Sequence, residues 1–173
     1  MSFRFETRRL IIRPWRAADR AGLERMTADA EMMRFITGRA WSSEQVDELL
    51  ERQQRHLAAY GVCFGAVELA ESGEIAGLVG MQPLDSGEFE IGWWIWRAYW
   101  GRGLAVEAAR PFIEHAGAMD LKRLWAVIYP PNAASIRVAI KLGMHYVGRV
   151  PARETISTRG DDPVALYRLD LTD

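Results

Sequence analysis

The chain has 173 residues, of which 49% are hydrophobic and 26% charged, and its formal net charge at pH 7 is -1. This length and balance predict one globular domain over 1–173 with a sizeable core. The near-zero net charge argues against a nucleic-acid partner, and no apolar run approaches the roughly 20 residues of a membrane span.

The N-terminus and the cysteine content predict a cytoplasmic protein. The first ten residues, MSFRFETRRL, lack the long apolar region of a signal peptide. Cys63 is the single cysteine and so cannot form an intramolecular disulfide, which is typical of a reducing compartment. The three histidines show no HExxH or other ligand spacing, so no metal site is expected.

The chain begins with a predicted strand and a predicted helix. Residues 9–14, RLIIRP, are expected to form the strand. Helical spacing of apolar residues follows at Ala17, Leu23 and Met26, and a short turn is expected over 32–36.

A longer helix is predicted over 44–60. Ser43 is its expected N-cap, because a serine oxygen can accept one of the free N–H groups of the first turn. Gly61 is the expected stop. One face of the helix should be buried, and it consists of Val46, Leu49, Leu50, Gln53 and Leu57.

The middle of the chain predicts three consecutive strands joined by short turns, which implies antiparallel hairpins. They span 62–69, 75–82 and 89–96.

The remaining elements predict a parallel step and a mixed sheet. A helix after Gly103 leads to a strand over 123–128 without a tight turn, which favours a parallel βαβ crossover. A further helix and two strands should close the chain, over 132–142, 145–150 and 164–171. The predicted class is α/β, or α+β with a partly open mixed sheet flanked by helices.

Residues 100–105, WGRGLA, connect a predicted strand to a predicted helix. Gly101 and Gly103 allow close approach of a ligand to backbone N–H groups, and the helix dipole favours an anion there. A phosphate site is therefore expected, with a plain turn and helix cap as the alternative. The Walker pattern is absent, and Val106 stands where a dinucleotide motif needs its third glycine.

A second half of the site is predicted after the next strand. Pro130 and Pro131 lack N–H donors, so the strand should leave its parallel neighbour there and open a cleft with unpaired backbone groups. Asn132 and Ser135 open the following helix, either as a cap or as ligand contacts. A ligand with phosphates at one end and amides along its length would fit, and coenzyme A has that form.

These two segments resemble the GNAT superfamily of acetyltransferases, and more narrowly its RimJ/RimL-like branch. The resemblance extends from ETRRLIIRPW to VALYRLDL and is most specific in EIGWWIWRAYWGRGLAVEA and NAASIRVAIKLGM. It implies a mostly antiparallel sheet with one splayed parallel pair, and acetyl-CoA as the cofactor.

The resemblance also implies the cofactor contacts. The family turn pattern, Q/R-x-x-G-x-G/A, falls on Trp100, Gly101, Arg102, Gly103, Leu104 and Ala105, with Trp100 in place of Q/R. Backbone groups of Ile95 and Trp96 would pair with the pantetheine arm, and Asn132 would bond it from the other side. Lys141 and Arg137 are candidates for the 3′-phosphate, or belong to a solvated helix face.

Glu90 is the candidate general base, because related acetyltransferases often carry a carboxylate on this strand. Glu154 is the competing candidate, and a salt-bridged structural role is the alternative for Glu90. Ser135 lies where the RimL-like branch has a serine proposed to assist the departing thiolate. Tyr129 is the weaker alternative, and Ala139 occupies the position at which many members have a tyrosine.

The implied reaction is direct attack of a primary amine on the acetyl thioester in a ternary complex. The amine would be a protein N-terminus or a small molecule, bound between the helices of 17–60 and the loop over 151–163. The resemblance to this branch is compatible with a homodimer. No nucleic-acid or membrane partner is expected. The competing hypotheses are a non-catalytic acyl-CoA-binding module and, more distantly, a nucleotide-binding oxidoreductase.

Overall fold

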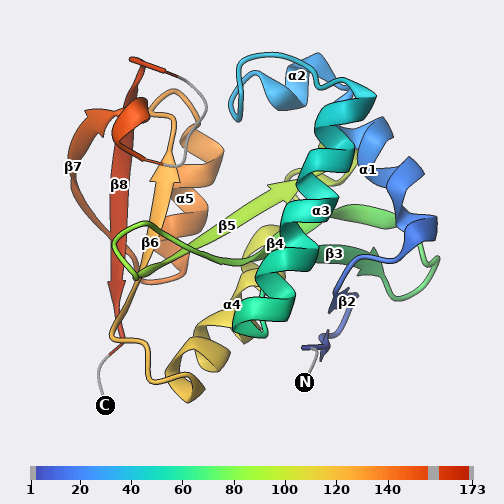
Figure 1. Cartoon of the computed structure of the whole chain (residues 1–173), viewed down its shortest axis with the longest axis horizontal. Helices are drawn as coiled ribbons and strands as arrows, with labels where there is room; N and C mark the ends of the chain where they lie inside the picture. Colours follow the sequence, from blue (N-terminus) through green and yellow to red (C-terminus); the bar gives the residue numbers. More distant parts are fainter. Residues whose placement is uncertain (1–2, 156–159, 172–173) are drawn as a thin grey trace.

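The computed structural model describes residues 3–155 and 160–171, and over these residues the chain forms one eight-stranded sheet flanked by helices (Figure 1). The strand order is β1-β2-β3-β4-β5-β6-β8-β7. The strands are β1 (Phe5–Glu6), β2 (Leu10–Arg13), β3 (Phe64–Leu69), β4 (Ile75–Pro83), β5 (Phe89–Ile95), β6 (Arg123–Ile128), β7 (His145–Pro151) and β8 (Pro163–Asp170).

All neighbouring strands pair antiparallel except β5 and β6, which are parallel. The predicted hairpins, the βαβ crossover and the mixed α/β class are therefore confirmed. Two features were not predicted. The two-residue strand β1 adds to the edge beyond β2, and β8 lies between β6 and β7 rather than following β7 in space.

The helices pack on the sheet in two hydrophobic clusters. They are α1 (Arg20–Thr27), α2 (Ala30–Met33), α3 (Ser43–Tyr60), α4 (Leu104–Ala118) and α5 (Ala133–Lys141). Phe112 of α4 belongs to one cluster with Ile91 and Ile95 of β5, whereas Leu49 of α3 belongs to the other with Leu78 of β4. Trp94 of β5 packs against this second cluster, so alternate residues of β5 face opposite layers, as period-two geometry requires.

The N-cap of α3 is Ser42, which corrects the expectation of Ser43. The Ser42 hydroxyl accepts a hydrogen bond from the Gln45 N–H, and the Gln45 side chain accepts one from the Ser42 N–H in return. This is a capping box, which satisfies two otherwise free donors. Ser43 instead bonds to the side chains of Glu24 and Arg20 on α1.

Ser42→Ala is expected to destabilise the protein by about 1 kcal/mol, because it removes the cap of α3. Urea unfolding would measure this loss as a lower midpoint at an unchanged m-value. Ser42→Asp is the matched control, since an aspartate oxygen can accept the same hydrogen bond. An equal loss in both variants would show that the cap is not the cause.

Within the described part of the chain, no helix combines the length and the apolar character that crossing a bilayer requires.

Candidate active site

The site lies where β5 and β6 separate. These strands pair only at Phe89↔Leu124 and Glu90↔Trp125, and beyond this register they diverge (Figure 1). The separation thus begins before the position of Pro130 and Pro131, where the sequence placed it. Polar groups face this separation, because the backbone N–H of Val127 in β6 lies close enough to the Glu90 carboxylate to favour its charged form.

Two adjoining cavities lie where β5 and β6 separate. The first, here called the Glu90 cavity, has a volume of about 820 Å³ and is lined by Glu90, Gln82 and residues of α3. The second, the turn cavity, has a volume of about 500 Å³ and is lined by Gly101, Gly103 and the start of α4. Both cavities share six lining residues, which are Phe35, Ile36, Trp93, Trp94, Asn132 and Ser135.

The glycine turn has the geometry of an anion site. Gly101 and Gly103 both have φ of 76°, a left-handed conformation that other residues adopt only with strain. Gly103 is the N-cap of α4 and supplies no capping side chain, so the first N–H groups of the helix are left for a ligand. A Cβ at Gly101 would meet no atom within 4 Å, so the backbone there stands open.

The turn cavity also contains cations and most of the predicted cofactor contacts. Arg137 and Lys141 line it from α5, and Gly101 and Gly103 line it from the turn. From the predicted set, the lining residues are Ile95, Trp100, Gly101, Gly103, Leu104, Ala105, Asn132, Ser135 and Lys141. Positive side chains and free helical N–H groups around one cavity suit a ligand with several phosphates.

Arg102 lies in the turn but does not line this cavity. Its guanidinium lies 5.3 Å from the centre of the Tyr99 ring, which is a cation–π arrangement. If Arg102 contacts the cofactor as predicted, the contact would come from its backbone in the turn and not from its charged side chain.

Trp96 lies outside both cavities, which corrects its predicted pairing with an extended ligand. Its N–H donates to the carbonyl of Ala76 at 2.8 Å, and its own carbonyl accepts from the N–H of Tyr99. Along an antiparallel strand, the backbone N–H and C=O groups of alternate residues point toward the paired strand, and those of the residues between them point to the opposite side. The free backbone edge of β5 is consequently formed by Trp93 and Ile95.

The carbonyl of Ile95 on that edge already has a partner, because it accepts a hydrogen bond of 2.6 Å from the indole N–H of Trp100. The backbone N–H of Ile95 and the groups of Trp93 remain directed toward the cleft. An extended ligand with amides can use these groups.

Asn132 and Ser135 lie where the two cavities meet. The Asn132 Oδ1 accepts the N–H of Ser135 at 3.1 Å, which caps α5, so the structural reading of Asn132 holds alongside a ligand role. The Ser135 Oγ accepts a hydrogen bond of 2.9 Å from the indole of Trp93. Its own O–H proton is therefore available for a group at the junction.

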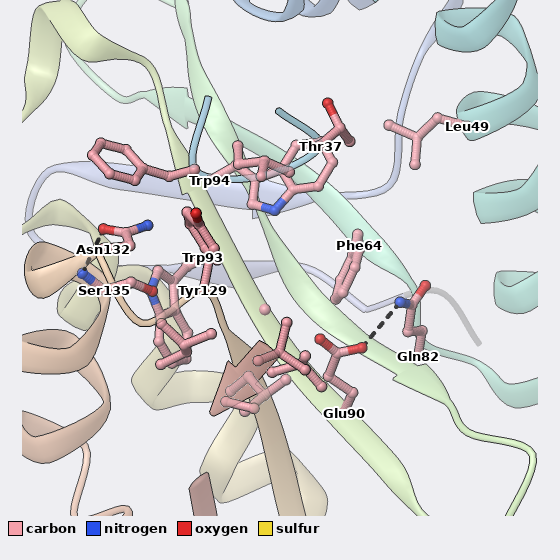
Figure 2. Close-up of a pocket in the computed structure, with 18 of the residues that line it drawn as sticks. Thr37, Leu49, Phe64, Gln82, Glu90, Trp93, Trp94, Tyr129, Asn132 and Ser135 are labelled. Atoms are coloured by element: carbon pink, nitrogen blue, oxygen red, sulfur yellow. Dashed lines mark hydrogen bonds between the residues drawn. The ribbon is translucent and has the colours of Figure 1, made fainter. Parts of the chain in front are cut away.

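Glu90 lies across the cavity from this pair, beside Gln82 (Figure 2). Only 7% of its surface is exposed, and Gln82 Nε2 donates to its carboxylate at 3.3 Å. Burial raises the pKa of Glu90 to about 8, against the opposing effects of Gln82, the Val127 N–H and the charge of Arg52. A carboxyl with a pKa near the working pH is well suited to accept and release a proton.

The competing candidates are placed differently. Glu154 is exposed and is not among the residues that line either cavity, whereas Tyr129 lines the Glu90 cavity. Asp162 also lines it, and Asp161 forms an ion pair with Arg153. Residues 156–159 of the loop that we expected to contribute to the amine pocket lie outside the described residues.

The sequence reasoning missed a polar stripe on α3. Four polar residues line the Glu90 cavity from this helix, and they are Gln45, Glu48, Arg52 and His56. Their spacing of three or four residues places them on one side of the helix. That spacing is present in the sequence beside the apolar face of the same helix.

Comparisons with known proteins agree with this geometry. The family model described as "Acetyltransferase (GNAT) domain" matches residues 9–145. An uncharacterized Bacillus subtilis (strain 168) protein, YkkB, is 34% identical over 143 residues, which cover 80% of this chain and 78% of the relative.

Solved structures show the same fold. An acetyltransferase from Agrobacterium tumefaciens str. C58 superposes with a TM-score of 0.82 at 25% identity, covering 99% of this chain and 96% of that one. RimL, a ribosomal L7/L12 alpha-N-protein acetyltransferase solved with coenzyme A, superposes with a TM-score of 0.78 at 16% identity, covering 95% of this chain and 96% of that one. The latter identity is low enough that the likeness concerns the fold alone.

Proposed function

The chain belongs to the acetyltransferase (GNAT) domain family, and we propose that it acetylates a primary amine by direct attack of that amine on acetyl-CoA bound in the same complex. Membership makes the chain an acetyltransferase that uses acetyl-CoA. The observation that carries the proposal is the junction of the two cavities. An anion cradle lies on one side of it, and a buried carboxyl with a raised pKa lies on the other.

The cofactor is assigned to the turn cavity. The N–H groups at the start of α4 would bind its diphosphate, with Arg137 and Lys141 near its remaining phosphate. The free edge of β5 at Trp93 and Ile95 would pair with the pantetheine amides, and Asn132 would bond them from α5. This arrangement directs the thioester toward Ser135, where the cavities meet.

Glu90 is proposed to take the proton that the attacking amine must lose. A lysine-type amine with a pKa near 10.4 is neutral in about one molecule in a few thousand at pH 7, whereas an α-amino group near 7.7–8.0 is neutral in roughly a tenth. As the nitrogen–carbon bond forms, the carbon–sulfur bond breaks. The proton on nitrogen passes to Glu90, directly or through water, and the Ser135 O–H donates a hydrogen bond to the departing thiolate.

We further propose that the chain is closest to the RimJ/RimL-like branch and acts in the cytoplasm. The segment EIGWWIWRAYWGRGLAVEA supports the branch, and the shared fold of RimL is consistent with it. The buried free thiol of Cys63 is consistent with the location.

Thermal unfolding with acetyl-CoA, compared with NAD and ATP, tests the cofactor half of this proposal. A ligand at about 100 times its dissociation constant adds about 2.7 kcal/mol of stability, which for a chain of this size is a shift of several degrees. We expect that shift with acetyl-CoA alone, followed by release of thiol when a suitable amine is added. Stabilisation by NAD or ATP but not by acetyl-CoA would contradict the assignment of the turn.

A further inference from the structure

The polar stripe of α3 gives the Glu90 cavity a charged wall. Gln45, Glu48, Arg52 and His56 all line the cavity from this helix. Burial and the nearby charges of Arg52 and Arg55 lower the pKa of His56, so its imidazole is neutral at physiological pH. Arg52 is consequently the permanent positive charge of this wall.

Arg52 differs from its neighbours on the same helix. Arg55 pairs with Glu51 at 4.0 Å, and the Asp47 carboxylate pairs with Arg20 at 2.7 Å. Among the residues that the structure describes, Arg52 forms no ion pair within the same limit of 4.0 Å. Desolvation and the charge of Arg55 lower the pKa of Arg52, and the charges of Glu48 and Glu90 oppose this shift.

The other charges of the cavity do not neutralise Arg52 in a fixed geometry. Glu90 has a pKa of about 8 and is therefore mostly uncharged at neutral pH. Glu48 lies one turn before Arg52 on α3 and is not bonded to it. Asp162 and Arg39 line the cavity from loops outside α3. Arg52 is solvent-exposed and lines the cavity without a bonded carboxylate. A guanidinium in this position is suited to bind an oxyanion, often through two parallel hydrogen bonds.

Building on the proposed function, we propose that the amine substrate carries an oxyanion, a carboxylate or a phosphate, and that Arg52 binds it while the amine lies near Glu90. Arg52 and Glu90 line the same cavity, Arg52 from α3 and Glu90 from β5. One small acceptor can therefore place its amine near Glu90 and its anion near Arg52. This assigns Arg52 as a specificity-determining residue and disfavours polyamines as acceptors.

Matched pairs of amines test this assignment. The probes are ω-amino carboxylates with chains of two to five carbons, each compared with its uncharged amide, and aminoalkyl phosphates compared with the corresponding amino alcohols. We expect the wild-type kcat/KM to favour the best anionic probe by about 10- to 100-fold, the worth of one charge-assisted interaction. The two series distinguish a carboxylate from a phosphate acceptor.

Arg52→Gln should reduce this preference to a ratio near one, mainly through the KM of the anionic probe. Arg55→Gln is the matched control, because Arg55 lies on the same helix, pairs with Glu51 and does not line the cavity. It should keep the wild-type ratio. Both variants should retain the acetyl-CoA stabilisation, since neither residue lines the turn cavity.

An equal kcat/KM for charged and uncharged probes, or a ratio that Arg52→Gln leaves unchanged, would overturn the inference. If acetyl-CoA stabilises the protein but no probe is acetylated, the inference is also rejected while the cofactor assignment stands. Failure of the proposed function looks different, because acetyl-CoA would then neither stabilise the protein nor support acetylation of either series.

Discussion

Glu90→Gln is expected to lower kcat by about 10²- to 10⁴-fold, the usual contribution of a positioned general base. Glutamine has nearly the same shape and can keep a hydrogen bond to Gln82, but it cannot take the proton of the attacking amine. In the wild type, the carboxyl has a pKa of about 8, so its ionised fraction rises through the mildly alkaline range. The wild-type kcat should therefore rise with pH with an apparent pKa near 8. This alkaline limb of the pH profile should be absent from the variant.

The same substitution should stabilise the protein at alkaline pH. A carboxyl in the unfolded chain has a pKa near 4.3, whereas burial raises the pKa of Glu90 to about 8. Between these values the folded protein holds a proton that the unfolded chain has released. The free energy of unfolding then falls by up to about 1.4 kcal/mol per pH unit as the pH rises.

The stabilising contribution of Glu90 is thus complete below about pH 4 and lost as the pH passes 8. Glutamine does not titrate, so the variant should exceed the wild type by on the order of a few kcal/mol at pH 9 and match it near pH 4. Urea unfolding across this range, together with kcat against pH, provides both readouts. Loss of activity together with a gain in stability is expected when a catalytic group is buried at a cost in folding free energy.

Glu154→Gln distinguishes the two candidate bases that the sequence left open. Glu154 is exposed and lines neither cavity. Loss of the alkaline limb in Glu154→Gln, with Glu90→Gln active, would reject the assignment of Glu90. A large loss of kcat without the stability gain at pH 9 would place Glu90 in catalysis but contradict its raised pKa.

Local signals in the sequence predicted the elements that carry the cofactor half of the site. Short polar turns identified the hairpins of β3, β4 and β5, and the glycine turn identified the start of α4 because Gly101 and Gly103 need a left-handed backbone. These features depend on neighbours in the chain.

Pairing between distant segments could not be predicted in the same way. The insertion of β8 between β6 and β7 has no local signal, and β1 is too short to show strand periodicity. The prolines suggested where β5 and β6 part, but the separation begins at the Glu90–Trp125 register. The cavity wall that includes Arg52 depends on how α3 packs relative to the sheet, which the helical spacing alone does not determine.

Gly103→Asp is expected to weaken acetyl-CoA binding by about 100-fold or more. The new carboxylate would lie at the N-terminus of α4, among the N–H groups assigned to the diphosphate, and would both occupy them and repel the ligand. Loss of one or two charge-assisted hydrogen bonds accounts for this magnitude. Calorimetric titration with acetyl-CoA would measure the dissociation constant directly.

Backbone strain is a separate effect, and Gly73→Asp controls for it. Gly73 has φ of 73° in the turn between β3 and β4, and a Cβ there would meet no atom within 4 Å. Both variants should lose about 1–2 kcal/mol of folding stability, because both force a left-handed conformation on a non-glycine residue. Only Gly103→Asp should lose acetyl-CoA affinity. Equal affinity in the two variants would mean that the diphosphate binds elsewhere, and the cofactor would have to be reassigned away from the turn cavity.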